Sequence, residues 1–474
     1  MDELYVQSKV TEKCDYYRRN VMFMQEILYD ALIITMNEKR EILNRSALVI
    51  EGKNILEIGD SETMLKKYPK AYRRDCRGKV IIPGFINLHT HQTLSIIRGS
   101  AEDLGTAPAY TKSVPQGQSL SIDESRIMAT LGAVEAVRFG STYIVDMYTN
   151  CETNAVAFEN VGIKAAVCEM VHDMDFYSLY KHEYHIDEAM GDALLERNIR
   201  LIEKWRNHEK IDCCIGLHAP DTCSKVFIQK ILKIQEHYNV PIATHLAQSP
   251  GEVARIHAYA GGLSPTAYYA ELGVLDRQLY AAHCIYVNDD DIRLLSDHHV
   301  NVVHVPEGNA KGGMVAPIHK MRNTGINLTM GTDNGSADMI DAMRISLCIG
   351  RVMAGRYDDP TTMQVLEMAT INGAKAIGKE KEIGSLEPGK HADFLVLDYR
   401  KSHLIPCLNP LGILLHTAIG SDIEDVYING RKIVEHGKVL TIDEEILLKE
   451  AQMVAKKQWM AVNQDINPEY ILNL

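Results

Sequence analysis

Features that would assign the chain to a membrane or secreted class are missing from this sequence. No apolar run approaches the roughly 18 residues that a membrane-spanning helix needs. The N-terminus, MDELYVQSKV, has acidic side chains where a secretory signal peptide has basic and apolar ones. We therefore expect a soluble, cytoplasmic protein that makes no membrane contact.

The sequence also lacks a long basic block and CxxC cysteine pairs, which bears on its binding partners and on its redox state. The chain has no long basic block, and its 50 Lys and Arg against 63 Asp and Glu give a net charge of -13. This charge argues against nucleic acid and favours a small neutral or cationic ligand. The ten cysteines include no CxxC pair, so we expect reduced core residues rather than disulfides or a thiolate metal site.

The sequence does contain a regular alternation of short apolar runs and amphipathic helical segments. Its 474 residues, 46% of them hydrophobic, can bury a large core. Eight strands are expected, at residues 81–89, 143–147, 165–170, 213–217, 241–245, 279–284, 300–305 and 327–331. Strands that alternate with helices eight times predict an α/β fold of the (β/α)8 TIM-barrel type.

The flanks of this region have a different pattern. Apolar runs alternate as β-strands on both sides, and Asn429-Gly430 is a strong hairpin signal. The flanking segments can form one small discontinuous β-sandwich, although patterning alone does not show that they meet. The predicted parts are an extension (1–24), the β-sandwich (25–79 with 383–440), the catalytic barrel (80–382) and a C-terminal helical segment (441–474).

The stretch PGFINLHTHQ places His89 and His91 at the end of the first barrel strand. Residues i and i+2 of a strand point to the same face, so the two imidazoles converge. Two neutral imidazoles side by side make half of a zinc-type site. An ordinary strand end with two polar side chains fits the motif alone equally well.

Other predicted strands also end in polar residues. A (β/α)8 barrel builds its active site at the C-terminal ends of its strands. Besides the first strand, these ends carry His218, His245, His283, His304 and Asp333. One histidine would more often be structural, but six histidines and an aspartate on six strands predict a metal site.

Five motifs, in their order and spacing, resemble the amidohydrolase superfamily: PGFINLHTH, ATHLAQSPGEV, AAHCIYVNDDDI, VVHVPEGN and MGTDNG. Within it the chain is similar to the heteroaromatic aminohydrolases, which include methylthioadenosine/S-adenosylhomocysteine deaminases, guanine deaminases and triazine hydrolases. EMATINGAKAIG followed by IGSLEPGKHADFLVLD is similar to this branch's return from barrel to β-sandwich. The resemblance implies a metal-dependent hydrolase that cleaves a C–N bond of a nitrogen heterocycle. It also implies a tendency to form homodimers or larger homo-oligomers.

The resemblance assigns roles to the strand-end residues. His89, His91 and His245 match three histidine ligands of one divalent metal ion, for which zinc is expected and iron or manganese is compatible. Asp333 matches the fourth protein ligand and proton acceptor, and His283 matches the histidine that orients water and substrate. A metal lowers the pKa of its water toward about 7, and a carboxylate beside it can take the proton.

Five residues are expected on the substrate side. His218 lies in GLHAPDTCS, which resembles the HAPYTCS stretch with which nucleoside deaminases contact substrate. A loop-anchoring role is the alternative for His218. The other four are Gln248, His304, Glu307 and Tyr110.

Gln248 departs from the family pattern HxxE, in which a glutamate protonates the ring nitrogen. A glutamine cannot cycle a proton, and general acid catalysis is typically worth about 10² to 10⁴ in rate. Glu252 or Glu307 can take over the role, although Glu252 is otherwise interpreted as a solvated helix residue. The leaving group or ring can also be of another kind, as in triazine hydrolysis. A metal-binding protein with little activity is the third explanation.

Two loops also depart from the pattern. VHVPEGN replaces the family's HNPxSN, so Glu307 stands where small polar residues are common. A carboxylate there can select a cationic or NH-rich ligand, or it is a surface charge on a loop. In the loop after the first strand, Tyr110 is expected to cover the site as part of a lid.

Overall fold

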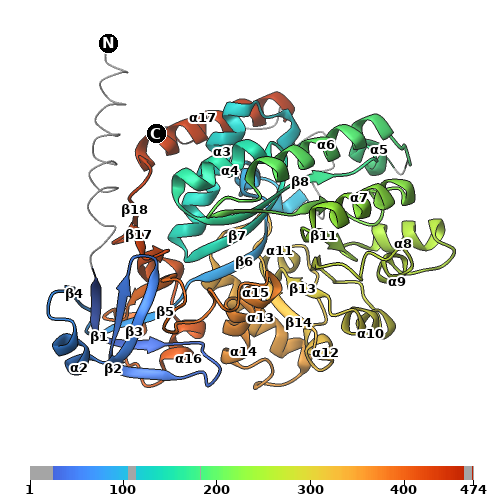
Figure 1. Cartoon of the computed structure of the whole chain (residues 1–474). Coiled ribbons are helices and arrows are strands. Elements are labelled where there is room, and N and C mark those ends of the chain that lie inside the picture. The colour runs from blue at the N-terminus through green and yellow to red at the C-terminus, as the bar shows by residue number, and fades with distance from the viewer. Residues whose placement is uncertain (1–24, 105–113, 182, 464–471, 473–474) are drawn as a thin grey trace, which may run out of the picture.

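The computed structural model describes residues 25–104, 114–181, 183–463 and 472. Its central sheet is a nearly closed barrel of parallel strands in the order β6-β7-β8-β10-β11-β12-β13-β14, with β9 paired to β8 (Figure 1). A parallel bridge between Thr90 and Asp333 joins the first strand to the end of the last. The predicted (β/α)8 barrel is confirmed. Its strands are β6 (Phe85–Thr90), β7 (Ser141–Tyr148), β8 (Lys164–Val171), β9 (Ile211–Cys213), β10 (Ile215–Leu217), β11 (Ile242–Leu246), β12 (Leu279–His283), β13 (Asn301–His304) and β14 (Asn327–Met330).

Helices surround these strands, so every residue of β7 and β8 is buried, as in parallel strands covered on both faces. Their ends follow local rules. A capping box between Ser121 and Glu124 starts α3, and Asn239, in the left-handed conformation, ends α7. The helices are α3 (Ile122–Arg138), α4 (Cys151–Val161), α5 (Phe176–Tyr180), α6 (Glu188–Trp205), α7 (Lys225–Tyr238), α8 (Pro250–Tyr259), α9 (Pro265–Glu271), α10 (Asp289–Asp297), α11 (Pro306–Lys311), α12 (Ile318–Arg322), α13 (Met339–Ala354), α14 (Thr362–Met368) and α15 (Ile371–Ala376).

Both flanks of the chain contribute to a second, mixed sheet beside the barrel, at the lower left of Figure 1. Its order is β18-β17-β16-β15-β5-β1-β2-β3, with β4 paired to β1. The flanks meet where β15 runs antiparallel to β5, with Leu395 opposite Ile82. The strands are β1 (Glu26–Ile34), β2 (Ile42–Glu51), β3 (Asn54–Asp60), β4 (Tyr72–Asp75), β5 (Lys79–Pro83), β15 (Phe394–Asp398), β16 (Ile423–Ile428), β17 (Arg431–Glu435) and β18 (Lys438–Val439), with α2 (Ser61–Lys67) and α16 (Pro410–His416) beside them.

The strand predicted over residues 81–89 is two strands. β5 belongs to the second sheet and β6 to the barrel, with Gly84 between them. A Cβ atom at Gly84 would lie 2.2 Å from the side chain of Thr142, so the chain can pass from one sheet to the other only with glycine here. The domain boundaries themselves stay predictions.

The C-terminal helix α17 (Glu444–Val462) returns to the barrel and lies against α3 (Figure 1). The indole N–H of Trp459 donates to the backbone oxygen of Ile96 at 2.7 Å. In the part of the chain that the structure describes, seven of the nine cysteines are buried, as expected of core residues, whereas Cys348 is exposed and Cys407 is partly buried. None of the described helices combines the length and apolar character needed to span a bilayer. The predicted extension 1–24 and Tyr110 lie outside the described residues.

Candidate active site

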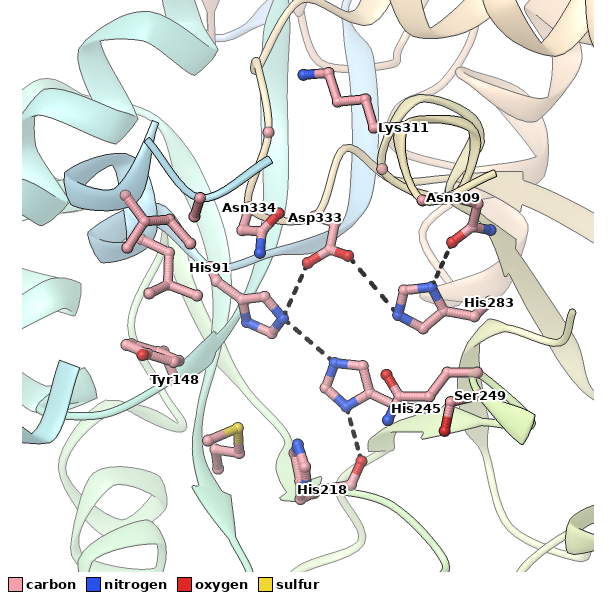
Figure 2. A pocket seen from close by; sticks show the side chains of 18 of the residues that line it. His91, Tyr148, His218, His245, Ser249, His283, Asn309, Lys311, Asp333 and Asn334 are labelled. Atoms are coloured by element: carbon pink, nitrogen blue, oxygen red, sulfur yellow. Dashed lines mark hydrogen bonds and ion pairs between the residues drawn. The ribbon is translucent and has the colours of Figure 1, made fainter. Parts of the chain in front are cut away.

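A cavity of about 210 Å³ opens at the C-terminal ends of the barrel strands. Figure 2 shows imidazoles and a carboxylate pointing toward one another at its centre. His89, His245 and His283 lie on β6, β11 and β12. His91 is the first residue after β6, and Asp333 is the third residue after β14. The structure therefore brings together the five side chains to which metal or proton-transfer roles were assigned.

The five side chains form one compact group. The Nε2 atom of His91 lies 3.3 Å from Asp333 Oδ1, and that of His89 lies 3.8 Å from the same oxygen. His283 Nε2 lies 3.8 Å from the other carboxylate oxygen. The Nε2 atoms of His91 and His245 are 3.3 Å apart. A divalent cation can be held by such a group, within which the ligand atoms of His89, His245 and His283 lie within 4.8 Å of one another.

The hydrogen bonds of the imidazoles fix their tautomers. His91 Nδ1 bonds to the backbone oxygen of Met147, and His245 Nδ1 bonds to the backbone oxygen of His218 at 2.8 Å. A carbonyl oxygen only accepts, so each Nδ1 carries a proton and each Nε2 of a neutral ring presents a lone pair. Two lone pairs that face each other at 3.3 Å repel, unless a cation lies between them.

Burial keeps these rings neutral. It lowers the pKa of His89, His91 and His245, and in His91 it outweighs the opposing effect of Asp333. Neutral imidazole is the form that binds metals. His89 Nε2 is buried and has no hydrogen-bond partner among the described residues. These donors therefore fit a divalent metal ion.

The backbone is strained where these groups meet. His283, Asp333 and Ala247 have positive φ values of 74°, 62° and 50°. Residues other than glycine rarely adopt this region, and such strain clusters at functional sites. His283 is oriented from its other side, because its Nδ1 lies 2.9 Å from Oδ1 of Asn309.

His218 lines the cavity beside this group. Its Nδ1 lies 2.8 Å from the Thr222 hydroxyl, and its ring centre is 4.9 Å from that of His245 and 4.8 Å from that of Phe176. His218 therefore faces the cavity and is also held by its own loop.

Gln248 lines the same wall, whereas Glu252 does not line the cavity. Glu252 is fully buried, so its interpretation as a solvated helix residue is wrong. Its two oxygens accept hydrogen bonds from the backbone N–H groups of Ala247 and Gln248, at 2.7 and 2.8 Å. Burial and the neighbouring Asp221 raise the pKa of Glu252 to about 8, against these hydrogen bonds.

His304 and Glu307 are buried and do not line the cavity. Burial lowers the pKa of His304 to about 4. Glu307 pairs with Lys311 at 2.7 Å, and Lys311 does line the cavity. The interpretation of Glu307 as a surface charge is therefore wrong.

Sequence reasoning missed an ion pair on the cavity wall. Asp221 Oδ2 accepts a hydrogen bond from Arg255 Nε at 2.8 Å, and both side chains line the cavity. The signal was present, because Asp221 occupies the Tyr position of the resembling HAPYTCS motif. Asn309, the partner of His283, also had a signal, because it is the final asparagine of the HNPxSN pattern and is retained in VHVPEGN.

Comparison with known proteins agrees with this architecture. The model of the Amidohydrolase family matches residues 80–433. A 5′-deoxyadenosine deaminase of Methanosarcina acetivorans is 30% identical over 91% of this chain and 98% of the relative. A 5-methylthioadenosine/S-adenosylhomocysteine deaminase of Thermodesulfovibrio yellowstonii is 32% identical over 88% of this chain and 95% of the relative.

A solved structure shares the fold. The crystal structure of an adenosine deaminase from Xanthomonas campestris with bound zinc superposes with a TM-score of 0.83 and 22% identity, covering 92% of this chain and 99% of that one. The chain therefore belongs to the amidohydrolase family, and with it to the hydrolases that act on carbon–nitrogen bonds.

Proposed function

We propose that the protein is a metal-dependent deaminase that hydrolyses the exocyclic C–N bond of an adenine-type nucleoside. The printed activities of its two relatives support this substrate class. The observation that carries the metal requirement is the 3.3 Å approach of the His91 and His245 Nε2 atoms, whose Nδ1 protons are already engaged.

His89, His91, His245 and Asp333 would hold the metal ion, and we expect zinc, with iron or manganese compatible with the same donors. When bound, a divalent ion activates water and polarises the substrate. Asp333 faces His91 and His283 with different carboxylate oxygens, so one oxygen remains available to accept a proton from the attacking water.

The residues of the chain would move the proton as follows. One water and one nucleoside yield an oxo-substituted ring and ammonia, so one water proton must reach the ring nitrogen and the other the departing nitrogen. Asp333 would accept each proton in turn and pass the first to the ring nitrogen and the second to the leaving amine, because Gln248 cannot cycle one. His283, fixed by Asn309, would orient the water and the ring, while His218 and Gln248 contact the heterocycle from the cavity wall. Tyr110, His304 and Glu307 keep their predicted substrate-side roles only as proposals.

We also propose a location and an oligomeric state for the enzyme. A cytoplasmic location is supported by the free state of the nine cysteines that the described ranges contain. Self-association into a homodimer or larger homo-oligomer stays a prediction from the family resemblance.

Ammonia release tests the substrate class. The zinc-reconstituted protein is incubated with 5′-deoxyadenosine, methylthioadenosine, S-adenosylhomocysteine, guanine and an aminotriazine, with Asp333→Ala as the blank. We expect release from the adenine nucleosides that is absent from the blank. Release only from the triazine would favour a triazine over an adenine nucleoside as the substrate. Silence across the panel would favour displacement of another ring substituent or a metal-binding protein without turnover.

A further inference from the structure

The turn between β11 and α8 is held by a buried carboxyl group. Glu252 is 0% exposed, and its two oxygens separately accept the N–H groups of Ala247 and Gln248 at 2.7 and 2.8 Å. Its own N–H donates to the Ser249 hydroxyl at 3.1 Å. Glu252 thus binds both residues that separate Leu246, at the end of β11, from the helix cap.

This arrangement differs from an ordinary helix cap. Ser249 is the N-cap of α8 and Glu252 is the third helical residue. In a capping box, the carboxylate at that position returns to the N–H of the N-cap residue itself. Here it passes Ser249 and binds the two preceding N–H groups, so it organises the segment that leads from the strand rather than the helix end.

The same turn is tied to the neighbouring strand end. Ala247 adopts φ 50°, and its backbone oxygen accepts the N–H groups of Ile285 and Tyr286 at 3.1 and 2.9 Å. The backbone oxygen of Leu246 accepts the N–H of Cys284, next to His283, at 2.9 Å. The N–H groups of Ala247 and Gln248 and the backbone oxygen of Ala247 are therefore all hydrogen-bonded. These bonds fix the backbone at Gln248, and with it the direction in which the Gln248 side chain leaves the backbone.

A carboxyl group suits this position because both of its oxygens can accept a hydrogen bond, with or without a proton on the group, whereas a glutamine amide offers one acceptor oxygen and an NH2 group that only donates. A donor placed against a buried backbone N–H would leave that N–H unsatisfied. Glu252 also does not line the cavity, so it cannot reach a bound ring.

We propose that Glu252 is a positioning residue that holds the Gln248 side chain on the cavity wall in the orientation in which it contacts the heterocycle. The inference rests on the proposed function for the identity of the ligand. It replaces the idea that Glu252 supplies the missing acid, because Glu252 acts through the backbone of Gln248 and not on the substrate.

Hydrogen–deuterium exchange tests the hydrogen bonds without turnover. In the zinc-loaded full chain, the amides of Ala247 and Gln248 should be protected, and Glu252→Gln should make their exchange roughly tenfold faster. Glu236→Gln, the same change on an exposed residue of α7, should leave the segment unchanged. Unprotected amides in the wild-type protein would overturn the proposal.

A double-mutant cycle tests whether the effect passes through Gln248. It is measured as the dissociation constant of 5′-deoxyinosine, the expected product, so turnover is not required. Glu252→Gln should weaken binding roughly tenfold in the wild-type background and less than about twofold in the Gln248→Ala background. Equal losses in both backgrounds would show a general structural role and overturn the proposal, as would no loss in either.

The two measurements separate this inference from the proposed function. A wild-type protein that binds no purine and releases no ammonia contradicts the proposed function alone. In that case the exchange rates at Ala247 and Gln248 still decide whether Glu252 holds the turn. The Tm of each variant is recorded, and Glu252→Asp, which keeps two acceptor oxygens on a shorter side chain, should retain more protection than Glu252→Gln if the protein tolerates either change.

Discussion

The imidazoles of His91 and His245 face each other in a way that two neutral rings do not adopt unaided. Both Nδ1 atoms are committed to backbone oxygens, so the facing Nε2 atoms have no proton to share. Asp333 adds a carboxylate oxygen, Oδ1, 3.3 Å from Nε2 of His91. This arrangement of acceptors is the feature that most specifically requires a cation.

Gln248→Glu tests the departure from the family pattern at the position of the general acid. A carboxylic acid at this position of the cavity wall can protonate a ring nitrogen, so we expect kcat/KM for 5′-deoxyadenosine to rise by about tenfold or more. Gln118→Glu, which adds the same charge elsewhere on the wall, is the control and should give no rise. An unchanged rate for Gln248→Glu, with native activity present, would show that glutamine is not a defect.

Some of the individual site residues could be predicted from the sequence, and others could not. The metal-type residues could be predicted because each is a polar side chain directly after an apolar run. Glu252 could not, because nothing in its helical pattern shows that its carboxylate turns back to bind Ala247 and Gln248. Burial of Glu307 depends on its partner Lys311 and on neighbours distant in sequence.

Among the elements, α3 and α17 are joined through one carboxylate. Glu124 accepts hydrogen bonds from Ser121 in its own capping box and from Lys457 and Gln458 of α17, at 2.8, 2.8 and 3.1 Å. Burial raises the pKa of Glu124, but these hydrogen bonds outweigh it and lower the pKa to about 2. The ionised carboxylate therefore stabilises the folded state.

The pH dependence of this contribution has a definite sign. Because the folded pKa lies below the ordinary value of 4.5, the stabilisation is fully present above about pH 4.5 and is lost as pH falls toward 2. Glu124→Gln should lower Tm at pH 7, by an amount that corresponds to about 1 kcal/mol for a lost cap. The difference from wild type should shrink below pH 4.5. Asp123→Asn, an exposed neighbour, is the control, and a difference that stays constant with pH would contradict the assignment.

Strands were predictable where apolar runs ended in turns or polar residues, but the split between β5 and β6 was not. The run Val80-Ile81-Ile82 continues after Gly84 as Phe85-Ile86, and nothing in its hydropathy marks a change of sheet. The change of sheet at Gly84 depends on a tertiary contact, because Thr142 of the next barrel strand leaves no room for a Cβ atom there. Such a contact is absent from any local pattern.

In the whole molecule, the N-terminal and C-terminal flanks also come together at Gly430. The residue has φ 67°, and its N–H donates to the Ala392 oxygen at 3.0 Å. A Cβ atom here would lie 2.0 Å from the backbone oxygen of Gly52, in the turn between β2 and β3. The hairpin signal Asn429-Gly430 was visible in the sequence, whereas its contact with the N-terminal flank was not.

Gly430→Ala tests this junction. The left-handed backbone alone costs an alanine about 1 to 2 kcal/mol, and the contact with Gly52 adds to it. Gly437→Ala is the matched control, because Gly437 has φ 73° and open space around its Cβ position. We expect Gly430→Ala to lower Tm clearly more than Gly437→Ala. Equal shifts would mean that the two flanks are not held together at this point.

Ammonia release should depend on the metal ion if His245 and its neighbours hold it for catalysis. Protein stripped with a chelator is titrated with zinc, and ammonia release from 5′-deoxyadenosine is followed beside His245→Ala. We predict no release from the stripped protein, a rise that levels off near one zinc ion per chain, and no recovery in the variant. Release that is independent of metal, or a zinc-loaded wild-type protein that releases no ammonia, would contradict the account.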